Sequence, residues 1–219
     1  MAFATINGIT VHYELLGEPD AKNIVVFSNS LGTDFRIWLP LFDEISDDIS
    51  VLLYDSRGHG LTGGADAPFG MEDLVDDLVA LVEHVGIKRA VFCGLSVGGL
   101  VCQGLWKKRP ELVKKLVLCD TAARIGTADV WNARIEAIAK GGLESIAENV
   151  MERWFTPDFH QERADELAGY RTMLCRQSAA GYAATCGAIR DSDFTDGLST
   201  ISVPVLCVVG DQDGSTPVD

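Results

Sequence analysis

The chain has 219 residues, of which 47% are hydrophobic and 23% are charged, so it is long enough to bury a core. Disordered, collagen-like and small disulfide-stapled classes are excluded. Its formal net charge of -14 repels nucleic-acid phosphates and anionic lipid headgroups, which argues against both as partners. The sequence shows no signal peptide and no apolar run of membrane-spanning length, which predicts a cytoplasmic protein. Six cysteines without C-x-x-C spacing predict reduced, mostly buried thiols, and no metal site is expected.

The N-terminal region predicts a hairpin followed by a buried strand. Asn7-Gly8 stands between β-branched residues, which is the strongest short signal for a two-residue hairpin turn. The run Ile-Val-Val-Phe at 24–27 is continuously apolar, as in a strand buried on both faces. Similar runs follow at residues 51–54, 90–93, 116–119 and 205–209.

Helical patterns separate these runs. In the clearest one, residues 71–85, apolar side chains recur at the spacing of one helix face and acidic side chains occupy the other. Strands that alternate with helices predict an α/β fold, with a mostly parallel central sheet and helices on both faces. Residues 1–121 and 199–219 would form this core.

Residues 122–198 break the alternation, because they show helical patterns but no convincing buried strand. We expect them to form an inserted helical cap, divided by glycine and proline into three or four short helices. The segment holds seven of the eleven arginines but one of the seven lysines. The helix propensity of arginine accounts for this enrichment. Recognition of an anionic ligand is the alternative, since a guanidinium matches a carboxylate in shape.

A serine stands between the apolar run 90–93 and the next helical pattern. Residues 94–98 read Gly-Leu-Ser-Val-Gly, the G-x-S-x-G motif in the strand–turn–helix setting that it requires. Such a turn strains the serine backbone, and side chains at the glycine positions would collide with neighbouring backbone. The Ser96 hydroxyl would then lie at the carboxyl edge of the sheet, beside N–H groups that stabilise an anion. We therefore predict that Ser96 is a nucleophile, with a structural turn as the alternative.

With this motif in place, the whole chain resembles the α/β-hydrolase fold, and its Asp-Ser-Arg-Gly-His-Gly at 55–60 is similar to a loop of that fold. Three segments are similar to 3-oxoadipate enol-lactonases: Ser-Asn-Ser-Leu-Gly-Thr at 28–33, Thr-Ala-Ala-Arg-Ile-Gly at 121–126 and Arg-Trp-Phe-Thr at 153–156. The resemblance implies hydrolysis of the enol-lactone of 3-oxoadipate in the bacterial breakdown of aromatic acids, without a cofactor. It also implies an oxyanion hole made by the backbone N–H groups of Leu31 and Val97.

The acid of the catalytic triad is predicted near the end of the sequence. Gly-Asp-Gln-Asp at 210–213 follows an apolar run and supplies two candidates. The pattern G-x-x-D with Thr-Pro behind it is similar to the family's, so we favour Asp213 over Asp211. Its role would be to fix the tautomer of a histidine and to stabilise the imidazolium. An Asx turn that ends a strand is the alternative.

The histidine of the triad is not found in the sequence. In this fold it follows the acid, beyond a further strand, and the sequence stops at residue 219. The four histidines present fit structural roles better: His12, His59, His84 and His160. The last strand and helix of the fold are also missing, so the run 205–209 would form an uncovered apolar edge. We expect the natural chain to continue past residue 219, with an impaired or partner-completed hydrolase as the alternative.

The predicted substrate, a small anionic lactone, carries a carboxylate that the net charge of the protein repels, so a local cation has to hold it. Arg134 and Arg124 are the leading candidates because they flank the start of the predicted cap. Trp131 and Trp154 are candidates for an apolar wall. An ordinary surface or packing role is the alternative for each.

Two other functions fit the pattern: a carboxylesterase or carbon–carbon bond hydrolase of the same fold, or a ligand-binding protein with little turnover. No oligomeric state is indicated.

Overall fold

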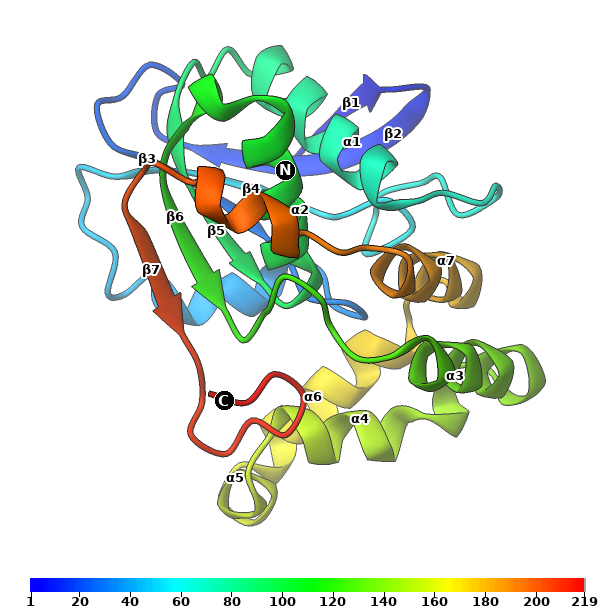
Figure 1. Ribbon diagram of the computed structural model, residues 1–219. Coiled ribbons are helices and arrows are strands. Elements are labelled where there is room, and N and C mark those ends of the chain that lie inside the picture. Colours follow the sequence, from blue (N-terminus) through cyan, green and yellow to red (C-terminus); the bar gives the residue numbers. More distant parts are fainter. Residues whose placement is uncertain (219) are drawn as a thin grey trace.

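The computed structural model describes residues 1–218. Their centre is a seven-stranded sheet with the order β1-β2-β4-β3-β5-β6-β7, in which β1 and β2 are antiparallel to their neighbours and the other strands are parallel (Figure 1). The strands are β1 (Ala2–Ile6), β2 (Ile9–Leu16), β3 (Ile24–Ser28), β4 (Ser50–Tyr54), β5 (Ala90–Leu95), β6 (Val113–Cys119) and β7 (Val205–Val208). The mostly parallel central sheet predicted from the sequence is confirmed.

The predicted hairpin turn lies between β1 and β2. Asn7 and Gly8 both have positive φ angles, 46° and 80°, which the right-handed twist of a two-residue hairpin requires. All six cysteines are free, and three of them are buried.

Two layers cover the faces of the sheet. The helices α1 (Met71–His84) and α2 (Val97–Lys108) pack together over one face, and their apolar side chains form the main core with the strands. The short 3-10 helix η1 (Phe35–Leu41) covers the other face, where Trp38 packs against Phe27 in a second, smaller core. A further 3-10 turn, η2 (Pro110–Leu112), leads into β6.

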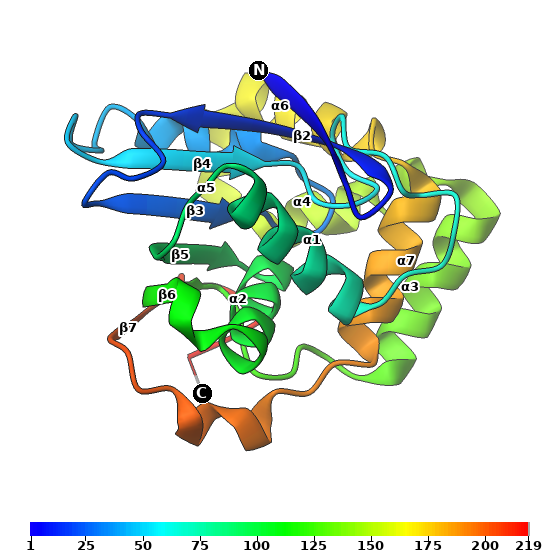
Figure 2. The ribbon, with the colours of Figure 1, turned by 90° about the horizontal axis from the view of Figure 1, so that it is seen from above.

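The segment between β6 and β7 holds helices and no strand. It contains five α-helices, not the three or four that we predicted, because Thr156 caps an additional short helix that begins with Pro157. These helices lie beyond the carboxyl ends of the parallel strands (Figures 1 and 2). They are α3 (Ala128–Gly141), η3 (Leu143–Ser145), α4 (Ala147–Trp154), α5 (Pro157–Glu162), α6 (Ala164–Cys175) and α7 (Ala179–Arg190), followed by η4 (Thr195–Thr200). We call residues 122–198 the cap.

The edge strand β7 is exposed along its whole length. Its four residues are accessible to solvent, with Leu206 57% exposed and Val208 47% exposed. The uncovered apolar edge predicted for this run is therefore present in the structure. The loop that follows β7 carries residues 210–218 back towards the cap, where it meets the site described next (Figure 1).

Candidate active site

Ser96 occupies a strained turn between β5 and α2. Its φ and ψ angles are 56° and -115°, a region that residues with a Cβ atom rarely adopt. Two neighbours from the end of β6 hold the turn in place. The Ser96 amide donates to the Cys119 carbonyl oxygen at 2.9 Å, and the Thr121 hydroxyl donates to the Ser96 carbonyl oxygen at 2.7 Å. The backbone therefore fixes the direction in which the Ser96 side chain leaves the chain.

The two glycines of the motif are required by space. A Cβ atom on Gly94 would lie 2.3 Å from the Gly98 carbonyl oxygen, and one on Gly98 would lie 2.1 Å from the Ser28 carbonyl oxygen. Both contacts are with backbone atoms, which cannot move aside without distorting a strand or a helix. The absence of side chains thus lets α2 begin directly against the loop after β3.

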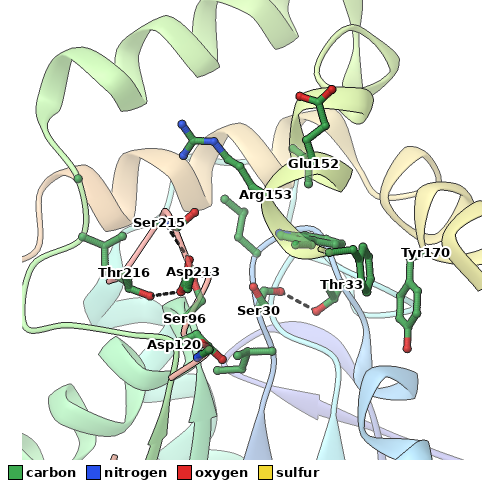
Figure 3. A pocket seen from close by; sticks show the side chains of 18 of the residues that line it. Ser30, Thr33, Ser96, Asp120, Glu152, Arg153, Tyr170, Asp213, Ser215 and Thr216 are labelled. Carbon is green, nitrogen blue, oxygen red and sulfur yellow. Dashed lines mark hydrogen bonds between the residues drawn. The ribbon is translucent and has the colours of Figure 1, made fainter. Parts of the chain in front are cut away.

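Ser96 opens onto a cavity of about 550 Å³ between the core and the cap. Figure 3 shows Ser96 and Asp120 on the side of the strands, with Glu152 and Arg153 on the opposite side, above them. The core contributes residues from the loops after β3, β6 and β7, and the cap contributes residues from α3, α4, α6 and α7. A cavity of this size with a few polar groups is typical of a site for a small organic ligand.

The loop after β3 lies beside Ser96 and is firmly braced. The Asn29 side chain donates to the Tyr54 carbonyl oxygen at 2.8 Å and accepts from Trp38 Nε1 at 2.7 Å. Leu31 lines the cavity, and within residues 1–218 its amide has no hydrogen-bond acceptor. Val97 is the first residue of α2, where an amide has no acceptor within the helix. The Leu31 amide is thus available to a ligand in the cavity, whereas Val97 is buried and is not among the lining residues, so its part in an oxyanion hole stays a prediction.

Two carboxylates lie in the segments that follow β6 and β7. The Asp213 carboxylate accepts from the Ser215 amide at 2.7 Å and from the Thr216 hydroxyl at 2.6 Å, so it forms the Asx turn considered above (Figure 3). The Asp120 side chain accepts from the Gly210 amide at 2.9 Å. Both aspartates line the cavity, as does the exposed Asp211. Asp120 thereby ties the loop that carries Asp213 to the end of β6.

Sequence reasoning missed Asp120. Its position directly after a buried apolar run, where parallel strands present their carboxyl ends, was the available signal. Its positive φ of 42° could not be read from the sequence.

Three of the four predicted substrate-binding residues line the cavity: Trp131, Arg134 and Trp154. The Arg134 guanidinium lies 5.1 Å from the centroid of the Trp131 ring, in the geometry of a cation–π contact. It also acts on Tyr182, whose pKa is raised by burial and lowered in part by the positive charge of Arg134.

The structure does not bring Arg124 to the site. Arg124 is not among the residues that line the cavity, and its exposed side chain lies 3.9 Å from Asp193. The same loop brings Ile125 and Gly126 to the cavity, but the Arg124 side chain points to solvent, so sequence proximity to the cap did not place it inside. Arg153 of α4, which we had not selected, lines the cavity instead.

No histidine within residues 1–218 lines the cavity. His12 is buried beside Asp55, with 2.7 Å between Nδ1 and the carboxylate oxygen, and stacks on Phe35. His59 is also buried, and burial lowers its pKa, which favours its neutral form. Both positions agree with the structural roles expected for them.

Within the same range, no cluster of three or more histidine, cysteine or acidic residues could hold a metal ion. None of the helices formed by residues 1–218 has the length and apolar character needed to cross a bilayer.

A model described as the alpha/beta hydrolase family matches residues 24–219. The chain belongs to the alpha/beta hydrolase family. It is 36% identical to 3-oxoadipate enol-lactonase 2 of Acinetobacter baylyi, over 98% of this chain and 80% of that relative. It is 30% identical to a putative carbamate hydrolase of Rhizobium rhizogenes, over 93% of this chain and 79% of that relative. The crystal structure of the enol-lactonase from Burkholderia xenovorans LB400 superposes with a TM-score of 0.95 at 36% identity, covering 99% of this chain and 84% of that one.

These similarities confirm the predicted resemblance to enol-lactonases within the alpha/beta hydrolase family. The protein is an ester hydrolase. Three features of this chain are suited to ester hydrolysis. They are the strained turn with Ser96, the loop after β3 that carries Leu31, and the cavity between them and the cap.

The strain at Ser96 predicts that a glycine at this position is more stabilising than an alanine. Ser96→Gly removes the Cβ atom from the positive-φ position, whereas Ser96→Ala retains it. We therefore expect the glycine variant to unfold with a free energy about 1 kcal/mol higher than the alanine variant. Urea denaturation of the two proteins measures the difference. An alanine variant that is at least as stable as the glycine variant would show that the turn is not strained.

The close approach at Gly98 predicts a loss of stability on adding one methyl group. Gly98→Ala places a Cβ atom against the Ser28 carbonyl oxygen and should cost about 2 kcal/mol or more. Gly169→Ala is the matched control, since this exposed position within α6 has no atom within 4 Å of the added Cβ. It should gain about 0.5–1 kcal/mol from helix propensity. Equal urea midpoints for the two variants would contradict the packing argument.

Proposed function

We propose that this ester hydrolase opens the lactone ring of 3-oxoadipate enol-lactone, with Ser96 as the nucleophile, in the breakdown of aromatic acids. The observation that carries the proposal is the strained turn that directs Ser96 into a cavity also lined by a guanidinium, that of Arg134. The 36% identity to an enol-lactonase of Acinetobacter baylyi supports the choice of substrate.

In the proposed reaction, Ser96 Oγ adds to the lactone carbonyl carbon as its proton passes to a general base. The resulting oxyanion accepts hydrogen bonds from the Leu31 and Val97 amides. The ring C–O bond then breaks, and the enolate that leaves is protonated on carbon to give the ketone. Water hydrolyses the acyl-enzyme, releasing 3-oxoadipate and restoring the Ser96 hydroxyl. The good leaving group explains why a nucleophile, a base and two amides suffice.

Asp213 is proposed as the acid that orients the base. Its two carboxylate oxygens each accept one hydrogen bond from residues 215 and 216, and each oxygen has lone pairs left for a further donor. A histidine N–H is the donor that this chemistry calls for. Residues 1–218 bring no histidine to the cavity, so the proposal assigns no residue to the base.

Arg134 is proposed to hold the substrate carboxylate, with Trp131 and Trp154 as apolar walls. Of the two arginines considered from the sequence, the geometry favours Arg134, because Arg124 lies outside the cavity beside Asp193. Stacking on Trp131 limits the positions open to the Arg134 side chain, which lowers the entropy lost on binding.

Hydrolysis of a carbamate is the second candidate function. The relative at 30% identity in Rhizobium rhizogenes is named a putative carbamate hydrolase, and the same serine and amides would serve a carbamate carbonyl. The lining holds both acidic and basic side chains, and Arg134 and Arg153 on the cap side are the groups that would favour a substrate with a free carboxylate. A comparison of the enol-lactone with a neutral carbamate therefore separates the two.

The decisive test is loss of the ultraviolet absorbance of the enol-lactone in the presence of protein expressed from its complete reading frame. Ser96→Ala should reduce kcat by about 10³-fold or more. A fluorophosphonate should label the wild-type protein at Ser96 and leave the variant unlabelled. Hydrolysis that persists in Ser96→Ala would remove the serine mechanism, and a labelled serine without lactone turnover would redirect the proposal to another ester.

A second variant tests the carboxylate contact. Arg134→Ala should raise KM for the anionic lactone about tenfold and leave KM for a neutral aryl ester unchanged, because a charge-assisted hydrogen bond is lost with one substrate alone. Arg176→Ala, an exposed cap residue away from the cavity, is the control. Equal increases in KM for both substrates in Arg134→Ala would show a packing role instead.

A further inference from the structure

A second hollow of about 450 Å³ adjoins the cavity, on the other side of its cap wall. It is a groove between α3 and α4. Five residues line both hollows, and these are Val130, Arg134, Val150, Glu152 and Arg153. Ala137, Ile146 and Asn149 line the groove alone. A single layer of side chains therefore separates the cavity from the groove, and that layer contains two arginines.

The two arginines of this wall differ from most others in the cap. Arg163, Arg171 and Arg190 each lie at 2.7 Å or less from a carboxylate oxygen, at Glu166, Glu148 and Asp191 respectively. For Arg134 and Arg153, no carboxylate oxygen of residues 1–218 lies within 4.0 Å. Two guanidinium groups that make no close ion pair, in a protein of net charge -14, are candidates to hold an external anion.

Glu152 is the opposing charge at this site. It lines both hollows beside Arg153, and in Figure 3 the Glu152 side chain points away from Ser96 while the Arg153 side chain runs sideways above it. The wall therefore carries two positive charges and one negative charge. That balance suits a single carboxylate, and it predicts that neutralising Glu152 strengthens anion binding.

We propose that the wall between α3 and α4 is a carboxylate-binding site built on Arg134 and Arg153, open from both the cavity and the groove. It takes the acid end of a substrate whose ester end lies at Ser96. This inference rests on the proposed function for the identity of the ester, and it extends that function to a substrate class. Because the groove opens to solvent, esters and lactones with a longer carboxylate arm fit as well as short ones.

Binding of adipate, with neutral adipamide as the control ligand, tests the site without any hydrolysis. Trp131 and Trp154 line the cavity, so quenching of tryptophan fluorescence reports occupancy, and calorimetry provides a second measurement. We expect adipate to bind and Arg153→Gln to raise its Kd about tenfold. Arg176→Gln, which makes the same change of net charge elsewhere in the cap, should leave Kd unchanged.

Two isosteric variants locate the carboxylate in the wall. Asn149→Asp adds a negative charge to the groove alone and should raise Kd for adipate two- to fivefold, whereas Glu152→Gln should lower it by a similar factor. Adipamide should respond to neither. Adipate affinity that is unchanged in Arg153→Gln, or reduced as much in Arg176→Gln, overturns the site. Insensitivity to Asn149→Asp overturns its opening into the groove.

These outcomes are independent of the proposed chemistry. A protein that binds adipate through Arg153 but does not open the enol-lactone keeps the site and loses the proposed function. A protein that opens the lactone without any effect of Arg153→Gln on adipate binding keeps the function and loses the site.

Discussion

The site depends on how closely the start of α2 approaches the loop after β3. Two backbones meet there with no room for a Cβ atom between Gly98 and Ser28. That approach places Ser96, the Val97 amide and the Leu31 amide at the same edge of the sheet, although they come from two separate segments. The cost is a serine held at a positive φ angle, and the hydrogen bonds to Cys119 and Thr121 keep it there.

The same edge of the sheet organises the acidic side of the site. Asp120 follows β6 and binds the Gly210 amide, so the loop after β7 starts from a fixed point. That loop then folds on itself through the two hydrogen bonds to Asp213. The β7 strand is exposed and has no neighbour on its outer side within residues 1–218, so the loop is held from the β6 side and by hydrogen bonds within itself. If Asp213 is the acid of the triad, as proposed, Asp120 is a positioning residue for it.

Much of this architecture could be predicted because it follows from local patterns. The buried parallel strands are continuous apolar runs, and the Asn7-Gly8 turn and the Gly-x-Ser-x-Gly turn each require particular residues at particular positions. The cap residues could be predicted only in part. Trp131 and Arg134 are three residues apart on α3, so one helix face carries both into the cavity. Arg124 lies in a loop whose path is set by tertiary contacts, and no periodicity describes such a path.

The groove between α3 and α4 was beyond prediction for a related reason. It arises from the packing of two helices against each other, and its residues become neighbours only in the folded chain. The predicted number of cap helices was too low for a local reason. Thr156 and Pro157 can mark the end of one helix or the start of another, and in the structure a further helix begins there.

The arginines of the cap include two groups with different surroundings. Arg163, Arg171 and Arg190 form exposed ion pairs on helix surfaces, as expected of a good helix former in an acidic protein. Arg134 and Arg153 face the hollows without such partners. If the proposed carboxylate site is correct, selection of an anionic ester depends on the two arginines that lack carboxylate neighbours, and the number of arginines in the cap matters less.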